Sequence, residues 1–322
     1  MVDSDRSSLM TQAICQKQRR FPKATSLFWL VILCVALRLI YYVVSDGFAL
    51  YKIENTFPVT EAWQISAPNE AELARIHDIC KQPFHYLGKG SQVYAFESAD
   101  GKYVLKLFKC YHLTPVQWLA RLPLPGELAH ARDEAVERRQ KKIDESLASY
   151  KIAADSLRDE CGLIYMQILP SSQFHLPVQL IDKLGRDLSI DLAQFGFILQ
   201  YKAELIFPKL ASWLAAGDQA SARSALESIV ALIVKRSKKG IQDQDPDLHK
   251  NAGLIGTSAI FIDLGSFHRN LQVCHEEVYR RDLVKISRRL RDWLQRAHPE
   301  LVPALDECIK SASTCTWKKP EA

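Results

Sequence analysis

Side chains with oxygen ligands gather in one short stretch, residues 240–254, with the sequence "GIQDQDPDLHKNAGL". Asp243, Asp245 and Asp247 occupy alternate positions, Asn251 follows them, and Asp263 lies twelve residues farther on. Mg²⁺ and Ca²⁺ bind carboxylate and amide oxygens, and an aspartate can also accept the proton of a hydroxyl group. A hairpin between positions 251 and 263 would bring Asn251 and Asp263 to one Mg²⁺. The stretch therefore predicts a metal site or a catalytic loop.

A calcium-binding loop is one alternative, because the three aspartates stand at its positions 1, 3 and 5. Such a loop also needs glycine at position 6 and glutamate at position 12, where this sequence has Leu248 and Leu254. The spacing excludes that class of site. A polar turn without a ligand is the other alternative.

Two glycines and a lysine have the residue types needed to hold phosphate. Gly88 and Gly90 stand between two β-rich runs, where glycine lets backbone N–H groups approach a phosphate without a side-chain clash. Lys106 follows eighteen residues after Gly88, within the apolar run "YVLKLF". An ordinary tight turn and a solvated edge lysine explain the same residues without a ligand. What favours a phosphate-binding role is the order of these residues along the chain.

The pattern around these residues predicts a sheet followed by helices. Residues 85–109 contain three β-rich runs joined by a glycine turn and by Asp100-Gly101, which predicts three antiparallel strands. Residues 127–157 lack glycine and proline and have apolar positions at helical intervals, which predicts one long helix with at most one interruption. Further strands are predicted within residues 162–169, 177–185, 195–205 and 258–267, and further helices within residues 209–216, 219–239 and 275–310.

The order of these pieces resembles the protein-kinase-like superfamily. A glycine turn, a strand lysine, a long helix with acidic residues, an aspartate-rich loop ending in Asn251 and a strand ending in Asp263-Leu264-Gly265 follow one another over residues 84–268. The match is closer to atypical branches, the HipA-like and aminoglycoside-phosphotransferase-like kinases, than to ordinary protein kinases. It implies an α+β, two-lobed fold: an antiparallel-sheet N-lobe with one long helix, residues 76–205, and a mainly helical C-lobe, residues 206–322.

The resemblance also implies roles for residues of the N-lobe. Gly88 and Gly90 would cover the phosphates of ATP, and Lys106 would hold the α- and β-phosphates. A glutamate of the long helix would orient Lys106, and Glu145 is expected in that role because it is closest to the following strand. Two other glutamates of the helix are the alternatives, Glu137 and Glu134, and a solvated salt-bridge role is as well supported for Glu145.

The same resemblance implies that Asn251 and Asp263 ligate the Mg²⁺ that bridges the phosphates. Gln200 and Tyr201 would lie where the two lobes join and the adenine ring packs. A plain buried strand end explains Gln200 and Tyr201 equally well.

The sequence departs from the kinase pattern at several points. Val93 stands where a third glycine is expected, Ala-Pro-Glu is absent, and the chain after Asp263 is too short for a long activation loop with a full helical lobe. A catalytic aspartate is expected five residues before Asn251, where the sequence has Pro246. Asp245 lies six residues before Asn251 and Asp247 lies four, so each is one residue away from the expected spacing. Asp245 is favoured, because Pro246 can fix the bend after it and leave Asp247 facing solvent.

Two functions fit these motifs. The first is a phosphotransferase that uses ATP and Mg²⁺ to phosphorylate a hydroxyl acceptor that the sequence does not identify. The alternative is a pseudokinase, a membrane-tethered nucleotide-binding or scaffolding module, which the displaced aspartate favours. The missing third glycine, the missing Ala-Pro-Glu and the short chain after Asp263 argue against a protein kinase that is switched by phosphorylation. The formal charge of +5, from 42 basic and 37 acidic residues spread along the chain, gives nucleic-acid binding no support.

An apolar segment at residues 26–44 has Arg38 as its one charged residue. Its length predicts a single transmembrane helix, residues 26–45, between a basic polar tail, residues 1–25, and a connector, residues 46–75. A signal peptide and a buried core helix are the alternatives. Four basic residues precede the span (Lys17, Arg19, Arg20 and Lys23), whereas only Lys52 follows closely. This bias favours an extracytoplasmic main domain, although the first span does not always set orientation, so the side stays open.

Overall fold

The computed structural model describes residues 23–54, 61–113, 121–171 and 174–312 of the 322-residue sequence. The chain divides into two compact units, residues 1–48 and 49–322. The predicted basic tail lies outside the described residues, apart from its last three positions.

The first unit contains helix α2 (Lys23–Val44). Its segment Ser26–Val44 has a mean hydropathy of 2.4, and none of it is buried. Nineteen residues at ~1.5 Å each give about 28 Å, close to the thickness of a bilayer's hydrocarbon core. The helix is therefore long and apolar enough to cross a membrane, and a signal sequence near the N-terminus passes the same test.

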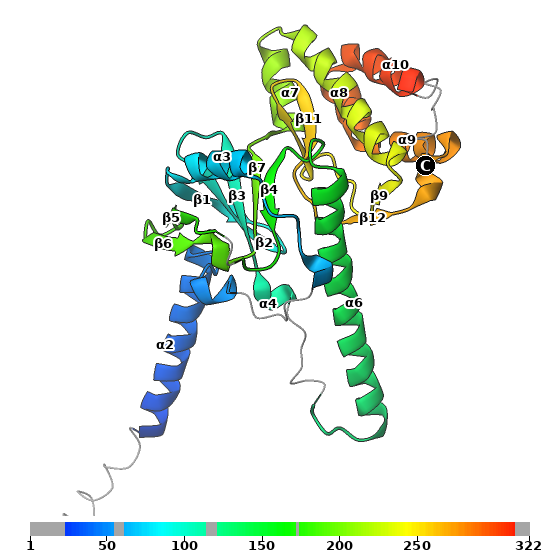
Figure 1. Ribbon diagram of the computed structural model, residues 1–322. Coiled ribbons are helices and arrows are strands. Elements are labelled where there is room, and N and C mark those ends of the chain that lie inside the picture. The colour runs from blue at the N-terminus through cyan, green and yellow to red at the C-terminus, as the bar shows by residue number, and fades with distance from the viewer. Residues whose placement is uncertain (1–22, 55–60, 114–120, 172–173, 313–322) are drawn as a thin grey trace, which may run out of the picture. The chain divides into compact units, whose positions relative to one another are not determined.

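The second unit is built on a seven-stranded sheet with the order β4-β7-β3-β2-β1-β5-β6 (Figure 1). Neighbouring strands are antiparallel, as predicted, except β1 and β5, whose parallel pairing the sequence did not predict. Gly101, at φ 69°, closes the hairpin between β2 and β3, a conformation that favours glycine. The strands are β1 (Phe84–Lys89), β2 (Val93–Ser98), β3 (Tyr103–Phe108), β4 (Leu163–Gln167), β5 (Pro177–Ile181), β6 (Asp187–Asp191) and β7 (Phe197–Tyr201).

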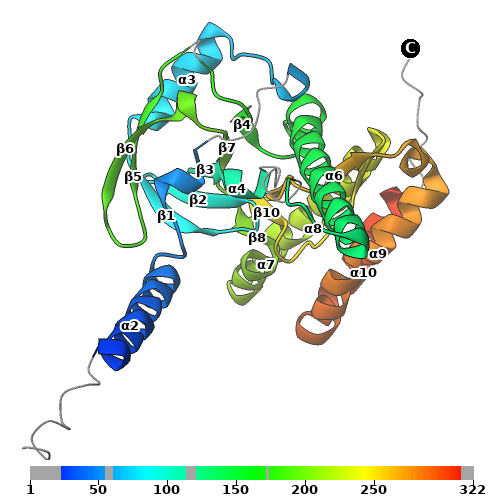
Figure 2. The same ribbon diagram turned by 90° about the horizontal axis from the view of Figure 1, so that it is seen from below.

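Helix α6 (Gly126–Ser156) is continuous over 31 residues, without the interruption that the sequence allowed. Its first half has no buried residue, whereas Ile143, Leu147, Tyr150 and Ala153 are buried in its second half. These positions recur every three to four residues, so one stripe of the second half packs on the core. Figures 1 and 2 show this half beside the sheet and the first half extending beyond it.

Helices and two small sheets follow β7. Gly240, at φ 67°, ends α8 at the predicted position. The helices are α7 (Ile206–Ala215), α8 (Gln219–Lys238), α9 (Glu276–Ala297) and α10 (Val302–Ala312). One small sheet has the order β11-β10-β8, and the other pairs β12 with β9. Their strands are β8 (Glu204–Leu205), β9 (Ile241–Asp243), β10 (Ala252–Ile255), β11 (Ser258–Phe261) and β12 (Phe267–Arg269).

The predicted mixed α+β architecture is confirmed, including the three strands of residues 85–109 and the long helix. Helix α3 (Glu70–Cys80) was not predicted, and the expected boundary between connector and N-lobe at residue 75 falls inside it. Asn69 caps α3 reciprocally with Glu72, a signal that was readable in the sequence. The remaining short elements are α4 (Cys110–Leu113), η1 (Leu50–Lys52), η2 (Glu61–Trp63), η3 (Leu192–Gln194), η4 (Leu271–Cys274) and η5 (Pro299–Leu301).

Candidate active site

Lys106 lies in the middle of β3, where the strand register places it between Ala95 of β2 and Ile198 of β7. Directly paired residues of antiparallel strands project from the same face, so these three side chains form one row across the sheet. The Lys106 ammonium donates a hydrogen bond to the main-chain carbonyl of Ile262. This contact joins the sheet to the residue immediately before Asp263.

Burial lowers the pKa of Lys106 to about 8, although the nearby Asp263 carboxylate and Cys161 both raise it. Desolvation disfavours the charged form of a buried lysine, whereas a nearby carboxylate favours it. The dominance of burial shows that Lys106 lacks full charge compensation. A desolvated cation in a pocket is suited to holding an anionic group.

The hairpin β10–β11 brings the backbones of Asn251 and Asp263 together, as the sequence predicted. Asn251 comes immediately before β10, and Asp263 comes two residues after β11. The main-chain N–H groups of Ile262 and Asp263 donate to the Asn251 carbonyl at 2.9 and 3.3 Å. The two side chains that were expected to bind a metal therefore start from adjacent points of the backbone.

Asp245 is tied to Asn251. The Asn251 side-chain nitrogen donates to the Asp245 main-chain carbonyl at 2.8 Å and to the Asp245 carboxylate at 3.2 Å. These contacts use the amide nitrogen, so the amide oxygen is the atom of Asn251 that remains for a metal ion. Asp245 and Asp263 line the same pocket. Of the candidate aspartates, Asp245 is the one whose carboxylate bonds to the Asn251 side chain and that shares a pocket with Asp263.

Asp247 was expected to face solvent, and this is wrong. Its carboxylate lies 3.1 Å from a guanidinium nitrogen of Arg289 on α9 and accepts a hydrogen bond from the His249 N–H at 2.9 Å. Only 17% of its side chain is exposed. The long guanidinium side chain covers Asp247, and Asp247 does not line the pocket that contains Asp245. Its contacts are those of a residue that fixes the loop.

Asp243 holds the start of the loop in the core. Its carboxylate lies 3.4 Å from the Arg236 guanidinium, and both side chains are almost fully buried. The same carboxylate accepts hydrogen bonds from the Asp245 N–H at 2.9 Å and from the Ser266 hydroxyl at 2.6 Å. Buried charges need such partners. Sequence reasoning missed Arg236 because it occurs among the surface-type charges at the end of α8.

A polar bridge that the sequence did not reveal links the glycine turn to α6. The Gln92 amide nitrogen donates to the Ser146 hydroxyl at 3.0 Å, and the Tyr150 hydroxyl donates to the Gln92 amide oxygen at 2.5 Å. Burial, followed by the Asp263 carboxylate, raises the pKa of Tyr150 above its ordinary value. Tyr150 therefore remains a neutral donor at physiological pH. The side chain of α6 that shares a pocket with Lys106 is Tyr150.

Ser149, fully buried on α6, holds the segment after Asp263. Its hydroxyl donates to the Leu264 carbonyl at 2.5 Å and accepts from the Phe267 N–H at 2.6 Å. The helix thereby satisfies two backbone groups on either side of Gly265 and Ser266. A serine in a charged helix gives no sequence signal for this role.

The two glycines differ in position. Gly90 lines the pocket that contains Lys106, its N–H donates to the Val93 carbonyl at 2.9 Å, and its carbonyl accepts from the Lys109 ammonium. Gly88 lies at an irregularity of the β1–β2 pairing, opposite Ala95, and does not line that pocket.

The expected pairing of Glu145 with Lys106 is not found. Glu145 is exposed, and no ion pair joins it to Lys106 in the part of the chain that the structure describes. It lines the pocket that also contains Asp245 and Asp263. The alternative Glu134 pairs with Arg138 at 3.0 Å in the exposed half of α6. The physical reason is helix phase, because position 150 faces the sheet while position 145 lies on a flank.

Gln200 and Tyr201 lie at the end of β7, where the seven-stranded sheet meets β8 and α7, but their side chains do not reach the pocket of Lys106. Gln200 is 2% exposed, and its amide nitrogen donates to the carbonyls of Cys161 at 2.8 Å and Phe261 at 3.4 Å. The Tyr201 hydroxyl accepts from Arg75, and both residues line a pocket without Lys106. Buried amides need hydrogen-bond partners, and the two carbonyls supply them to Gln200. Neither side chain lines the pockets around Lys106 and Asp263.

Two pockets meet at the candidate site. One of about 180 Å³ contains Gly90, Lys106 and Tyr150, and one of about 760 Å³ contains Glu145 and Asp245. Both are lined by three common residues, Ser91, Gln92 and Asp263. Among the residues that the structure describes, no three His, Cys, Asp or Glu side chains form a complete metal site. Two protein ligands suffice for Mg²⁺, which takes its other ligands from phosphates and water.

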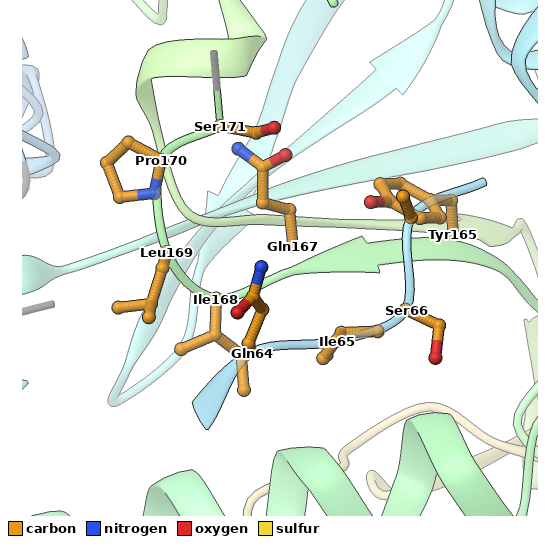
Figure 3. A pocket seen from close by; sticks show the side chains of 10 residues that line it. Gln64, Ile65, Ser66, Tyr165, Gln167, Ile168, Leu169, Pro170 and Ser171 are labelled. Atoms are coloured by element: carbon orange, nitrogen blue, oxygen red, sulfur yellow. The ribbon is translucent and has the colours of Figure 1, made fainter. Parts of the chain in front are cut away.

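A third pocket, of about 410 Å³, lies beside β4 (Figure 3). In Figure 3, Gln64, Ile65 and Ser66 line one side, and Gln167 and the following residues line another. None of its lining residues is charged, so this pocket lacks the groups that neutralise phosphate.

No protein-family model matches the chain, and no curated protein matches it. Among solved structures, a crystal structure of WbdD is 15% identical with a TM-score of 0.31, covering 74% of this chain and 48% of that one. A structure of the bifunctional kinase-methyltransferase WbdD is 16% identical with a TM-score of 0.33, at the same coverage. The chain spans about half the length of these WbdD chains. The Rv3197–erythromycin complex from Mycobacterium tuberculosis is 10% identical with a TM-score of 0.28, covering 88% of this chain and 75% of that one.

Proposed function

We propose that the second unit is a kinase-like phosphotransferase that moves the γ-phosphoryl group of ATP to a hydroxyl acceptor, with Mg²⁺ as cofactor. One observation carries the proposal. The Asn251 amide holds Asp245 while the Asn251 backbone holds Asp263, and Lys106 reaches the adjoining carbonyl of Ile262. The residues proposed as base, metal ligands and phosphate-binding cation thus come together from a sheet and a loop that are distant in sequence. This is the set that phosphoryl transfer requires.

In this proposal each side chain has one task. Lys106 binds the α- and β-phosphates, and Gly90 lets the turn before Val93 approach them. Asn251 and Asp263 offer one amide and one carboxylate oxygen, which are the hard ligands that Mg²⁺ prefers. When bound, Mg²⁺ neutralises charge on the phosphates.

Asp245 completes the reaction centre by orienting the acceptor hydroxyl and taking its proton as the new bond forms. The hydroxyl oxygen bonds to the γ-phosphorus, the bond from that phosphorus to the β–γ bridging oxygen breaks, and ADP leaves with the electron pair. The fixed distance from Asn251 keeps Asp245 close to the metal ligands without making it one. The Asp243–Arg236 pair holds the loop in place during turnover.

The test compares Asp263→Ala and Asn251→Ala with the full-length chain in neutral detergent, supplied with ATP, Mg²⁺ and a broad set of hydroxyl acceptors. Phosphate transfer and slow ATP hydrolysis are both measured. Asp78→Asn is the matched control, because Asp78 is exposed on α3. Loss of turnover in the first two variants alone supports the metal assignment. Unchanged turnover in both would refute it.

A pseudokinase is the second candidate, and one observation favours it. Asp245 lies six positions before Asn251 instead of five. Mg·ATP would then raise the melting temperature without phosphate reaching any acceptor.

We also propose that α2 anchors the chain in a membrane as a single span, with the main domain outside the cytoplasm. The basic residues before the span and their scarcity after it support this orientation. Protease treatment of sealed vesicles tests it. Residues 46–322 are protected when they lie inside the vesicle and are digested when they lie outside.

A further inference from the structure

A cationic pocket of about 370 Å³ lies between the glycine turn and α6. Its basic lining consists of His112, which follows β3, and of Arg138, Arg139 and Lys142 of α6. The three α6 residues recur at helical spacing on one side of the helix, so they converge on the same space. None of the described residues that line the pocket is acidic.

Arg139 is held in place and has an unused donor. One of its terminal nitrogens donates to the main-chain carbonyls of Tyr111 at 2.8 Å and His112 at 3.3 Å. Its Nε is buried and has no hydrogen-bond partner among the residues that the structure describes. A buried donor without a partner costs free energy, which a ligand with an acceptor oxygen would recover.

The surrounding charges are poorly compensated. Burial, together with Lys109, Arg139 and Lys142, lowers the pKa of His112. Glu134 bonds to Arg138 at 3.0 Å, but both side chains are about half exposed or more, so the pair is weak. The pocket therefore repels cations and favours an anion.

The cationic pocket adjoins the proposed reaction centre. Four residues, Ser91, Gln92, Lys142 and Ser146, also line the 760 Å³ pocket that contains Asp245 and Asp263. A molecule with its hydroxyl group near Asp245 can therefore extend past Lys142 into the cationic pocket. Lys106, the cation proposed for the nucleotide, does not line the cationic pocket but lines the 180 Å³ pocket.

We propose that the cationic pocket binds a phosphate group on the acceptor, so that the substrate is a hydroxyl compound that already carries a phosphate ester. This rests on the proposed phosphotransferase function. Two guanidinium groups and an ammonium group provide many donors around a small volume, which suits the several oxygens of a phosphate better than the two of a carboxylate. The same group can belong to a soluble metabolite or to a lipid headgroup.

The first experiment measures binding of inorganic phosphate to the full-length chain in neutral detergent. Lys142→Gln is compared with Lys141→Gln, a neighbouring exposed lysine that does not line the pocket. Loss of one charge-assisted contact weakens binding about tenfold, so this loss is expected for Lys142→Gln and a change below about twofold for Lys141→Gln. Arg139→Lys keeps the charge but removes Nε, and it should also weaken binding. Equal losses in both lysine variants, or none, would overturn the proposal.

A second variant separates this site from the nucleotide site. Phosphate binding should persist in Lys106→Met, whereas Mg·ATP binding should be lost. Phosphate binding that depends on Lys106 and not on Lys142 would refute the cationic pocket and leave the phosphotransferase proposal intact. Phosphate binding that depends on Lys142, in a chain that never binds Mg·ATP, would refute the phosphotransferase and with it the acceptor role.

The acceptor itself is tested with matched pairs of compounds. Glycerol 3-phosphate is compared with glycerol, and phosphatidylglycerol with a diacylglycerol in mixed micelles. Transfer to the phosphorylated member of one pair is expected, and the Lys142→Gln variant should raise its KM more than it lowers kcat. The pair that reacts identifies a soluble or a lipid source. Equal transfer to both members of each pair would refute the proposal.

Discussion

Replacing Lys106 with methionine should stabilise the protein while removing its affinity for nucleotide. The side chain keeps a similar length and volume, but the buried charge is gone. Burial lowers the pKa of Lys106 from 10.5 to about 8, and each tenfold change in a proton-binding constant corresponds to ~1.4 kcal/mol. The protonated lysine therefore costs the folded state ~3 kcal/mol at neutral pH relative to the unfolded chain. Lys106→Met should raise the melting temperature by on the order of 5 °C at pH 7.

The pH dependence follows from the direction of that pKa change. Between pH 8 and pH 10.5 the unfolded wild-type chain holds the Lys106 proton and the folded chain has released it. The unfolded state binds more protons in this window, so wild-type stability rises with pH relative to the variant. The advantage of Lys106→Met should shrink above pH 8 and disappear near pH 10.5.

Thermal melts of both chains in neutral detergent, from pH 6 to pH 10.5, measure this difference. Lys102→Met is the control, because Lys102 is exposed in the turn immediately before the same strand. It should change stability little at any pH. Mg·ATP should stabilise wild type and Lys102→Met but not Lys106→Met. A Lys106→Met variant that is less stable than wild type at pH 7, or whose difference is independent of pH, would refute the account of Lys106 as an undercompensated buried cation.

Three further predictions concern the loop and its supports. Asp245→Asn should reduce turnover by a factor on the order of 100 or more. Asp247→Asn should instead lower the stability of the loop. Steady-state kinetics and melting curves distinguish the two effects. Arg236→Met should lower the free energy of unfolding by about 3 kcal/mol, because it leaves the buried Asp243 carboxylate without its cation. Urea titrations measure this change. A change below about 1 kcal/mol would contradict the burial of this pair. Ser149→Ala should cost about 1–3 kcal/mol and speed hydrogen exchange of the main-chain amide at position 267, since two backbone groups lose their partner, and unchanged exchange there would count against the bond.

Local patterns were enough to predict the three strands of residues 85–109 and the hairpin after Asn251, but not β6 or the order of the seven strands. The strands around Lys106 alternate with a tight turn at Asp100-Gly101, and the hairpin that joins Asn251 to Asp263 needed only twelve residues of sequence. Both inferences use interactions between residues close in the chain, where spacing and turn chemistry decide the outcome. The position of Lys106 on the face of Ala95 and Ile198 follows from strand pairing alone.

Contacts across the chain were not predictable in the same way. Gln92 and Tyr150 are 58 positions apart, and Ser149 and Leu264 are 115 positions apart. Glu145 was expected to pair with Lys106, but the charges of its helix lie on several sides. The sequence alone therefore could not show which residue of the helix faces the sheet. The phase of a helix against a sheet is set by which apolar stripe is buried, and in α6 that stripe runs through Ile143 and Leu147.

The missing glutamate has a consequence for the proposed chemistry. In the resemblance, a helix carboxylate balances the strand lysine, but in this chain α6 presents the neutral Tyr150 to the pocket of Lys106. The carboxylate that acts on Lys106 is Asp263, the same residue that is proposed to ligate Mg²⁺. A metal ion bound to Asp263 would offset the negative charge that stabilises the Lys106 ammonium. Lys106 would then lack a counter-charge unless a phosphate bound together with the metal. On the proposed function, metal and nucleotide therefore bind as one unit, because Lys106 and Mg²⁺ compete for a single carboxylate and the phosphates relieve both.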